Sequence, residues 1–381
     1  PFLGCNLSCK YCYERNYRGK EKPMIRYDLE AILKKMEEFK DLDMALHGGE
    51  PLVIPKKDVA RIFEKMFELK GRSGIQTNGT LIDEEYIEMF KKYKTSVGIS
   101  YDGPGMLSDF RKSAPVEKTI RRLVKEGIVT SIIMVVSKAN AGTKERVQKL
   151  KRYLLDLKKI GIEGRINPCS GAPDCELELK ELIRVYLDLA KFCLENNLKW
   201  SPFIDLAHGL QGKSRVCSFM GCDIFHTQSA TVILDDGSIT NCMRTNQVGI
   251  LLRHPAQYNT RSEILTQTPQ KFGGCQDCKY WSACNGGCPS SAINNDWRNK
   301  SYLCELWKAL LQYFDNILHF TDYPFNVSEG TKKGCQPSRG IDPGIRHLDH
   351  QDNAINKDRE HGDSHEDTPH GDWANHLDSL K

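Results

Sequence analysis

The sequence predicts an α/β fold in which a parallel sheet or barrel is followed by a small cysteine-rich domain and a polar tail. Strand-like and helix-like stretches alternate over the first 200 residues, which is typical of βαβ units. Cysteines dominate from about residue 201 to Cys304, and the last fifty residues are polar and hold six of the 11 His. We therefore expect a barrel at 1–200, a cysteine-rich domain at 201–320 and a disordered tail at 321–381.

The expected strands are short and apolar, and the expected helices carry their apolar residues on one side. The strands are 44–47, 74–77, 97–100, 130–136 and 162–167. The helices are 57–70, 83–93, 116–126, 144–159, 176–197 and 301–320, with Asp83 as a capping residue. Asp235, Asp236 and Gly237 predict the turn of a hairpin.

The bulk composition limits the class of protein. The chain has 381 residues, 39% of them hydrophobic, which is enough to build a sizeable core. Its net charge is only +4, so nothing in the composition predicts a nucleic-acid surface. The longest apolar runs are strand-sized, which excludes a membrane span. No secretion signal is visible, and 15 clustered Cys indicate metal binding in a reducing cytoplasm. Because residue 1 is Pro, we expect the natural N-terminus to be missing.

The first cysteine group supplies three thiolates within eight residues, at Cys5, Cys9 and Cys12. An ordinary four-iron cluster takes four Cys ligands, so three close ligands leave one iron open. A zinc site, or a ferredoxin-like cluster with a remote fourth Cys, would also fit this spacing.

This motif, with the aromatic Tyr11 before the third Cys, resembles the signature of the radical S-adenosylmethionine (SAM) superfamily. The segment Gly48, Gly49, Glu50 and Pro51 resembles its GGEP motif. The resemblance implies a partial barrel of six βα units and an open iron that chelates SAM. The two glycines would let the backbone approach the methionine moiety, and Glu50 would accept from its amino group. The implied reaction is reductive cleavage of SAM followed by hydrogen abstraction from a substrate.

Two further strand ends resemble cofactor contacts of peptide-modifying and sulfatase-maturing members. Asn78 follows the stretch 74–77, and Ser100 and Asp102 close the stretch 97–100. Polar groups at the carboxyl ends of barrel strands are where sites are built, so these three residues are candidates for the ribose or adenine. The alternative is plain turn chemistry.

The second cysteine group resembles the SPASM domain, preceded by an eighth thiolate at Cys217. The resemblance implies two auxiliary four-iron clusters with interleaved ligands. The first would take Cys217, Cys222, Cys242 and Cys288, and the second Cys275, Cys278, Cys284 and Cys304. Such clusters would carry electrons or support the structure. The alternative is zinc, because Cys275 and Cys278 alone resemble half of a zinc site.

The resemblance breaks down after Cys242. Sulfatase-maturing members have an Asp there that acts as base, whereas this chain has Met243 and then Arg244. We interpret Arg244 as a solvated residue, with binding of a substrate carboxylate as the alternative. The expected function is therefore post-translational modification of a peptide or protein, of the kind performed by maturases of ribosomal peptides. The expected partners are that substrate and a low-potential donor such as flavodoxin or ferredoxin.

Two other functions stay open: anaerobic sulfatase maturation, and a non-catalytic iron–sulfur protein for electron transfer or metal binding. Four cysteines lie outside the motifs. We expect Cys193 in the core, and either incidental thiols or a substrate or cluster contact at Cys169 and Cys175; Cys335 has no assigned role. The His/Asp-rich tail is interpreted as solvated, with weak metal binding or a fused peptide substrate as alternatives.

Overall fold

The computed structural model describes residues 4–14, 26–112, 116–213, 231–240, 242–247 and 261–318. The chain forms two compact units, 1–337 and 338–381, and every described residue belongs to the first. The expected tail and Cys217, Cys222 and Cys335 lie outside the described residues. The proposed domain boundaries near residues 200 and 320 stay a prediction.

The central sheet is parallel, which confirms the α/β prediction. Its strand order is β1 (Ser73–Thr77), β2 (Thr95–Ser100), β3 (Thr130–Val136) and β4 (Gly164–Pro168). Single parallel bridges extend both edges, because Leu46 pairs with Ile75 and Ser201 pairs with Arg165. The stretch 44–47 was expected as a strand and contributes only such a bridge. Since the strands are parallel, their carboxyl ends lie along one edge, where sites of α/β folds are built.

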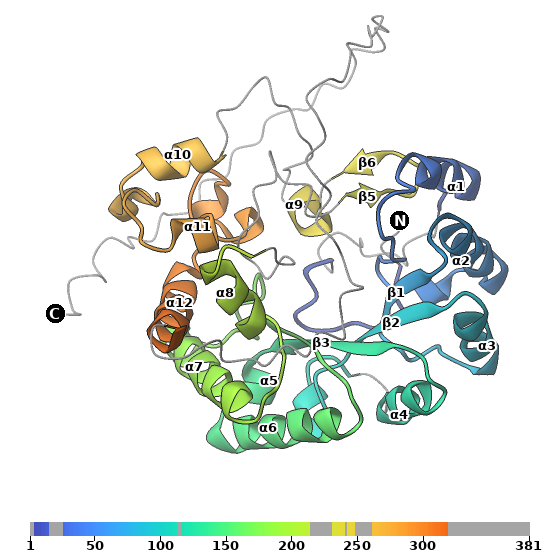
Figure 1. The fold of residues 1–381 in the computed structure, drawn as a ribbon, viewed down its shortest axis with the longest axis horizontal. Helices are drawn as coiled ribbons and strands as arrows, with labels where there is room; N and C mark the ends of the chain where they lie inside the picture. Colours follow the sequence, from blue (N-terminus) through green and yellow to red (C-terminus); the bar gives the residue numbers. More distant parts are fainter. Residues whose placement is uncertain are drawn as a thin grey trace, which may run out of the picture. The chain divides into compact units, whose positions relative to one another are not determined.

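Helices follow the strands close to the predicted positions. They are α2 (Lys56–Lys70), α3 (Glu84–Lys92), α4 (Glu117–Lys125), α6 (Lys144–Lys159) and α7 (Leu179–Glu195). Figure 1 shows these helices following one another around the outside of the sheet. As predicted, Asp83 caps α3, because its Oδ1 accepts a hydrogen bond from the backbone N–H of Tyr86 at 3.1 Å. The short helices α1 (Leu29–Glu38), α5 (Lys138–Ala141) and α8 (Phe203–Leu210) were not predicted.

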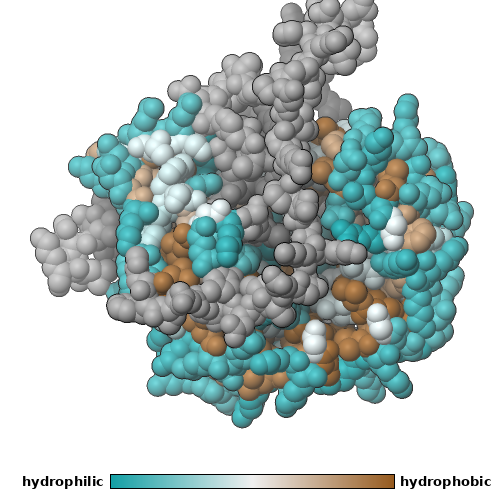
Figure 2. Space-filling view, in the orientation of Figure 1, coloured by the Kyte–Doolittle hydropathy of each residue, from teal (hydrophilic) through white to brown (hydrophobic). Residues whose placement is uncertain are grey.

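One hydrophobic core joins the parallel sheet and its helices to the cysteine-rich region. Ile99, Ile132 and Ile166, on three neighbouring strands, are fully buried. The closing helix α12 (Cys304–Leu318) packs against α7 and α8, and it buries Trp307 and Phe314 in the same core. In Figure 2 hydrophilic side chains dominate the outer helical rim, while hydrophobic residues gather inside it. The described cysteine-rich elements are therefore anchored to the sheet and its helices.

The cysteine-rich region consists of short elements. The strands β5 (Val232–Ile233) and β6 (Ile239–Thr240) form the predicted antiparallel hairpin, with its turn at 235–237. The helices are α9 (Met243–Gln247), α10 (Arg261–Gln267) and α11 (Trp281–Cys284). The carbonyl of Asp235 accepts a hydrogen bond from the N–H of Asp28 at 2.7 Å, which ties the hairpin to the start of α1. Within the described ranges no helix has the length and hydropathy needed to cross a membrane.

Candidate functional site

The loop with the first three cysteines is fixed to the strand edge of the sheet. The N–H of Glu50 donates to the carbonyl of Gly4 at 2.7 Å, just before the first cysteine. The side-chain amide of Asn78, which follows β1, lies 3.9 Å from the sulfur of Cys5. Cys9 is buried and the other two cysteines are half-buried. The structure thus brings the cysteine loop, the GGEP segment and the end of β1 together, as predicted.

The thiols of this loop influence one another. Burial raises the pKa of Cys9 to about 11, and the charges of Cys12 and Cys5 add to the increase. A cationic group would relieve this cost by holding the sulfurs as thiolates. Yet in the ranges that the structure describes, no three His, Cys, Asp or Glu side chains are placed to hold a metal ion. The choice between a four-iron cluster and a single zinc ion in this loop therefore stays a prediction.

Glu50 is fully buried and links the GGEP segment to β1. Its side chain caps the short 3₁₀ helix Pro51–Val53 (η2), since Oε1 accepts from the N–H of Leu52 at 3.1 Å. Oε1 also accepts from the hydroxyl of Thr77 at 2.7 Å, and Oε2 from the N–H of Asn78 at 2.6 Å. Burial raises the pKa of Glu50, although these donors oppose the increase. Glu50 thus makes three hydrogen bonds within the protein, and its expected contact with the amino group of SAM stays a prediction.

Asp102 follows β2 but faces the protein interior rather than open space. It is 1% exposed, and its Oδ1 accepts from the N–H of Val135 at 2.9 Å. Its Oδ2 accepts a hydrogen bond from the hydroxyl of Tyr11 and lies 3.5 Å from Nε of Arg111. These contacts make Asp102 part of the packing of the cysteine loop. Its expected contact with ribose or adenine stays a prediction that this burial does not favour.

The other predicted cofactor contacts lie at the same edge of the sheet. Ser100, the last residue of β2, accepts a hydrogen bond from the side-chain amide of Gln76 at 2.9 Å. Gly48 and Gly49 are half-buried and Pro51 is buried. The structure therefore gathers these residues near the cysteine loop, and their contacts with SAM stay a prediction.

The second predicted auxiliary set comes together in space. Burial raises the pKa of Cys275 to about 11, and charges on Cys304 and Cys278 add to it. Burial also raises the pKa of Cys284 to about 12, with contributions from the same three cysteines. Four thiols spread over thirty residues of sequence are thus electrostatic neighbours. This gathering is what one shared cluster requires.

Cys242 and Cys288, two cysteines of the first predicted auxiliary set, lie next to elements that contact each other. Cys242 immediately precedes α9, which packs against the 3₁₀ helix Pro289–Ser291 (η5). Nε of Arg244 donates to the hydroxyl of Ser290 at 3.3 Å, and this hydroxyl lies 3.0 Å from the sulfur of Cys288. The prediction of a solvated Arg244 is therefore wrong: the residue is half-buried and bonded within the site.

Three buried or bridging residues have no signal in the sequence. Arg111 lies against Cys9 and Tyr11, far along the chain from both. Arg261 is 1% exposed and donates to backbone carbonyls of the cysteine-rich loops, those of Asn285, Gly286, Gly287, Trp297 and Asn299. Tyr302 donates to the hydroxyl of Ser170 at 2.9 Å, which joins the cysteine-rich region to the loop after β4 (Gly164–Pro168). Arg side chains are mostly exposed and Tyr is intermediate, so a single Arg or Tyr in a sequence does not reveal such a role.

The cysteines outside the motifs separate into two environments. Cys193 is fully buried in α7, as predicted. Cys169 and Cys175 are buried in a small apolar cluster that also contains Cys9 and Tyr11. Burial raises the pKa of both thiols, as it does for the proposed ligand Cys9, so this shift does not separate packing groups from ligands. Whether either contacts a substrate or a cluster stays a prediction.

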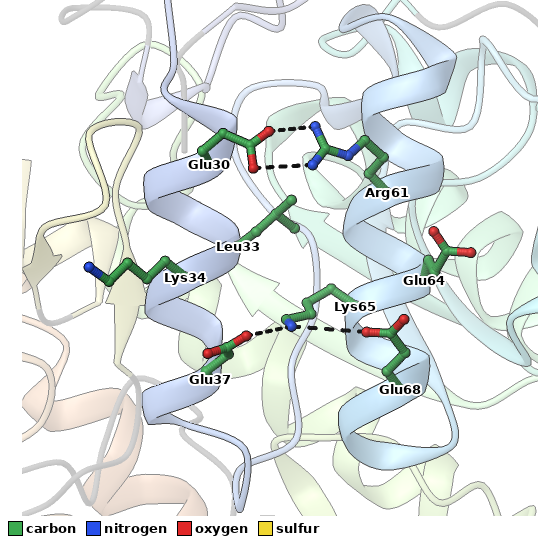
Figure 3. A pocket seen from close by; sticks show the side chains of 8 residues that line it. All are labelled: Glu30, Leu33, Lys34, Glu37, Arg61, Glu64, Lys65 and Glu68. Carbon is green, nitrogen blue, oxygen red and sulfur yellow. Dashed lines mark hydrogen bonds and ion pairs between the residues drawn. The ribbon is translucent and has the colours of Figure 1, made fainter.

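The groove between α1 and α2 carries no such chemistry. It is lined by charged side chains in ion pairs, Glu30 with Arg61 and Lys65 with Glu37 and Glu68 (Figure 3). These pairs are exposed and span two helices on the outer surface of the fold. They stabilise little and form no recognisable active site.

Comparison with known proteins agrees with this geometry. Residues 1–150 match the model of the Radical SAM superfamily. The chain is 24% identical over 351 residues to a cysteine-type anaerobic sulfatase-maturating enzyme of Clostridium perfringens, which covers 81% of this chain and 93% of that enzyme. It is 24% identical over 349 residues to the radical SAM cyclopropyl synthase TigE of Paramaledivibacter caminithermalis, covering 81% and 71%.

Solved structures show the same fold. The structure of anSMEcpe with bound AdoMet and Cp18Cys peptide superposes with a TM-score of 0.62 at 22% identity, over 83% of this chain and 96% of that chain. Streptococcus suis SuiB bound to precursor peptide SuiA superposes with a TM-score of 0.55 at 17% identity, over 80% and 74%. The parallel sheet and the cysteine loop at its edge are consistent with the match to the superfamily model and with the fold of these structures. Residues 1–150 therefore match the Radical SAM superfamily, and the chain has the fold of the anSMEcpe and SuiB structures.

Proposed function

We propose that this chain is a radical SAM enzyme that modifies a peptide or protein substrate, with a first cluster and two auxiliary clusters. The observation that supports the proposal best is the cysteine loop held beside Glu50 and Asn78 at the carboxyl edge of the sheet. A bare electron carrier has no need for a cofactor pocket next to its cluster. The proposed ligands of the first cluster are Cys5, Cys9 and Cys12.

The chain's own residues would hold and orient the cofactors. Cys5, Cys9 and Cys12 would bind three irons, and the carboxylate of Glu50 would accept from the amino group of SAM. When bound, the cluster and SAM supply one-electron chemistry and a hydrogen-abstracting radical. The buried surroundings of Cys9 would exclude water from that chemistry. Asn78 and Ser100 are the proposed contacts for the nucleoside.

The auxiliary clusters are proposed on the two cysteine sets. Cys242 and Cys288, with Cys217 and Cys222 from outside the described residues, would hold the first. Cys275, Cys278, Cys284 and Cys304 would hold the second. With four Cys each, neither cluster has an open iron, so both would carry electrons away from the substrate or support the fold. The proposed setting is a reducing cytoplasm with a flavodoxin or ferredoxin as donor, and the described cysteines form no disulfide.

The named relatives support a peptide as the substrate. One relative matures sulfatases, and the superposed structures hold a Cp18Cys peptide and the precursor peptide SuiA. Sulfatase maturation is the second candidate, which the likeness to the Clostridium perfringens enzyme favours. Met243 disfavours it, because this thioether replaces the expected Asp base after Cys242 and takes up no proton at ordinary pH.

The first experiment asks whether the chain cleaves SAM. Anaerobically reconstituted protein is mixed with dithionite and SAM, and 5′-deoxyadenosine is measured by chromatography. We expect product from the parent chain and none after Cys9→Ala. An intact cluster without product would support the non-catalytic alternative.

The second experiment separates the substrate candidates. A short peptide encoded beside the gene and a sulfatase-derived peptide with a target Cys are incubated separately, then analysed by mass spectrometry. A loss of two hydrogens from the former alone supports the maturase. Formylglycine in the latter supports sulfatase maturation.

The third experiment counts clusters. Iron and sulfide are measured in Cys275→Ala, Cys288→Ala and the control Cys193→Ala. We expect about four fewer irons per chain in each of the first two variants and no loss in the control. Unchanged iron in the first two variants would contradict the auxiliary clusters without affecting the SAM result.

A further inference from the structure

A buried ion pair lies directly beside the central cysteine of the first motif. Arg111 is 8% exposed and Asp102 is 1% exposed. The guanidinium Nη1 lies 4.0 Å from the sulfur of Cys9, and the carbonyl of Arg111 lies 3.6 Å from the same sulfur. Neither charged residue belongs to the cysteine motif or to the GGEP segment. Both nevertheless pack against the position proposed for the first cluster.

The ion pair is tied to the cysteine loop by several contacts. Tyr11, between the second and third cysteines, donates its hydroxyl to Oδ2 of Asp102. The guanidinium carbon of Arg111 lies 5.5 Å from the centre of the Tyr11 ring. The N–H of Lys10 donates to the carbonyl of Phe110 at 2.8 Å, which holds the loop beside the segment with Arg111. The charges are therefore placed by packing rather than by chance on a surface.

The guanidinium is not saturated by its carboxylate partner. Its Nε lies 3.5 Å from Asp102 in an ion pair, yet this buried nitrogen has no hydrogen-bond acceptor among the residues that the structure describes. Buried donors of this kind are rare and normally serve a nearby group. Another nitrogen of the guanidinium, Nη1, donates to the sulfur of Cys9 at 4.0 Å.

We propose that Arg111 and Asp102 set the reduction potential of the first cluster through Cys9, with Arg111 raising it and Asp102 lowering it. This proposal rests on the proposed ligand role of Cys9. One-electron reduction adds a negative charge to the cluster. A guanidinium hydrogen-bonded to a ligand sulfur stabilises that charge, and a buried carboxylate opposes it. Because both groups are buried, solvent and salt screen these effects weakly.

The test measures the potential directly in the full chain. Clusters are reconstituted without oxygen and titrated with dithionite and mediators, with reduction followed by electron paramagnetic resonance. The signal that is absent after simultaneous Cys5→Ala, Cys9→Ala and Cys12→Ala belongs to the first cluster. Arg111→Gln should make the midpoint potential of this cluster more negative by at least about 59 mV, which corresponds to a tenfold change in the equilibrium constant of a one-electron reduction.

A variant of Asp102 and a control variant of Lys10 test the direction of the change in midpoint potential. Asp102→Asn should shift the midpoint to more positive values, and the double variant should return toward the parent. Lys10→Gln removes the same charge from an exposed residue of the same loop, 5.1 Å from the ring of Phe110, and should leave the midpoint unchanged. If Arg111→Gln fails to load the cluster, Arg111→Lys and Asp102→Asn are compared in its place.

Two results would overturn the proposal. One is an unchanged midpoint in every variant that loads the cluster. The other is a shift in the same direction for Arg111→Gln and Asp102→Asn, which would indicate general damage to the fold. The potential is measured without SAM turnover, so absence of 5′-deoxyadenosine in the parent would count against the proposed function alone. Absence of any signal from the first cluster in the parent would count against its ligand set, and with it against this proposal.

Discussion

The guanidinium of Arg244 lies over the ring of Tyr13, with its carbon 5.1 Å from the ring centre. Tyr13 directly follows the third cysteine of the first motif, and Arg244 lies two residues after Cys242. Arg244 also reaches Ser290, whose hydroxyl touches Cys288. One side chain therefore connects the loop proposed for the first cluster to Cys288 through Ser290, and it lies two residues after Cys242.

We expect Arg244 and Tyr13 to be energetically coupled. A cation–π pair that is partly desolvated contributes about 0.5–2 kcal/mol. A double-mutant cycle with Arg244→Met and Tyr13→Leu, measured by anaerobic thermal unfolding, should give a coupling in this range. Arg244→Lys should keep part of the stacking and lose the bond to Ser290. Additive effects of the two substitutions would show that the contact contributes nothing.

Glu50→Gln should destabilise the fold before any cofactor binds. The amide keeps one acceptor oxygen for Leu52 and Thr77, but its NH2 group then faces the N–H of Asn78, where two donors meet. A buried donor left without an acceptor costs about 1–3 kcal/mol. Denaturant unfolding of the apo chain measures this loss. The exposed Glu68→Gln should change stability by less than about 0.5 kcal/mol, and a Glu50→Gln chain as stable as the parent would contradict the structural role.

Cys169→Ala with Cys175→Ala should leave the iron content unchanged. Both thiols lie in a small apolar cluster and belong to neither cysteine motif, so we expect them to act as packing groups. Each substitution should lower stability by about 1 kcal/mol, because it removes a buried sulfur. Loss of iron would assign one of these thiols to a cluster. Unchanged iron with full activity would leave both as packing groups.

Removing the Asp83 cap should weaken the fold in a pH-dependent way. Its hydrogen bond with Lys56 lowers the pKa of Asp83 below the usual 3.8. A lowered acid pKa stabilises the fold above pH 3.8 and loses this contribution as the pH falls further. Asp83→Ala should cost about 1 kcal/mol at pH 7 and less below pH 3.8. Asp83→Asn, which keeps the cap without the charge, should show a smaller loss, as measured by denaturant unfolding of the apo chain.

The secondary structure was predictable wherever local signals agreed. The range 144–159 was predicted as a helix and is α6, because apolar periodicity and its boundaries coincide there. The stretch 44–47 was predicted as a strand but forms only a single bridge at Leu46, since a short apolar run forms a bridge as readily as a full strand. Helix α8 was missed because its eight residues, Phe203–Leu210, are mostly apolar and are stabilised by burial against α12.

The sequence by itself determined the family-level chemistry of this protein. The spacing of Cys5, Cys9 and Cys12, the GGEP segment and the later cysteine array all depend on local order along the chain, which a sequence displays directly. The same holds for the doubt about sulfatase maturation, which follows from Met243 alone.

Only the tertiary structure decided what surrounds those motifs. In the structure Arg111 lies against Cys9, and Asp102 is buried beside Arg111. Arg244, which was expected in solvent, packs on the ring of Tyr13. These contacts join residues that are as many as 231 positions apart, from Tyr13 to Arg244. The physical reason is that burial and the neighbours of a charge depend on packing in three dimensions, which the sequence order of single charged residues does not express.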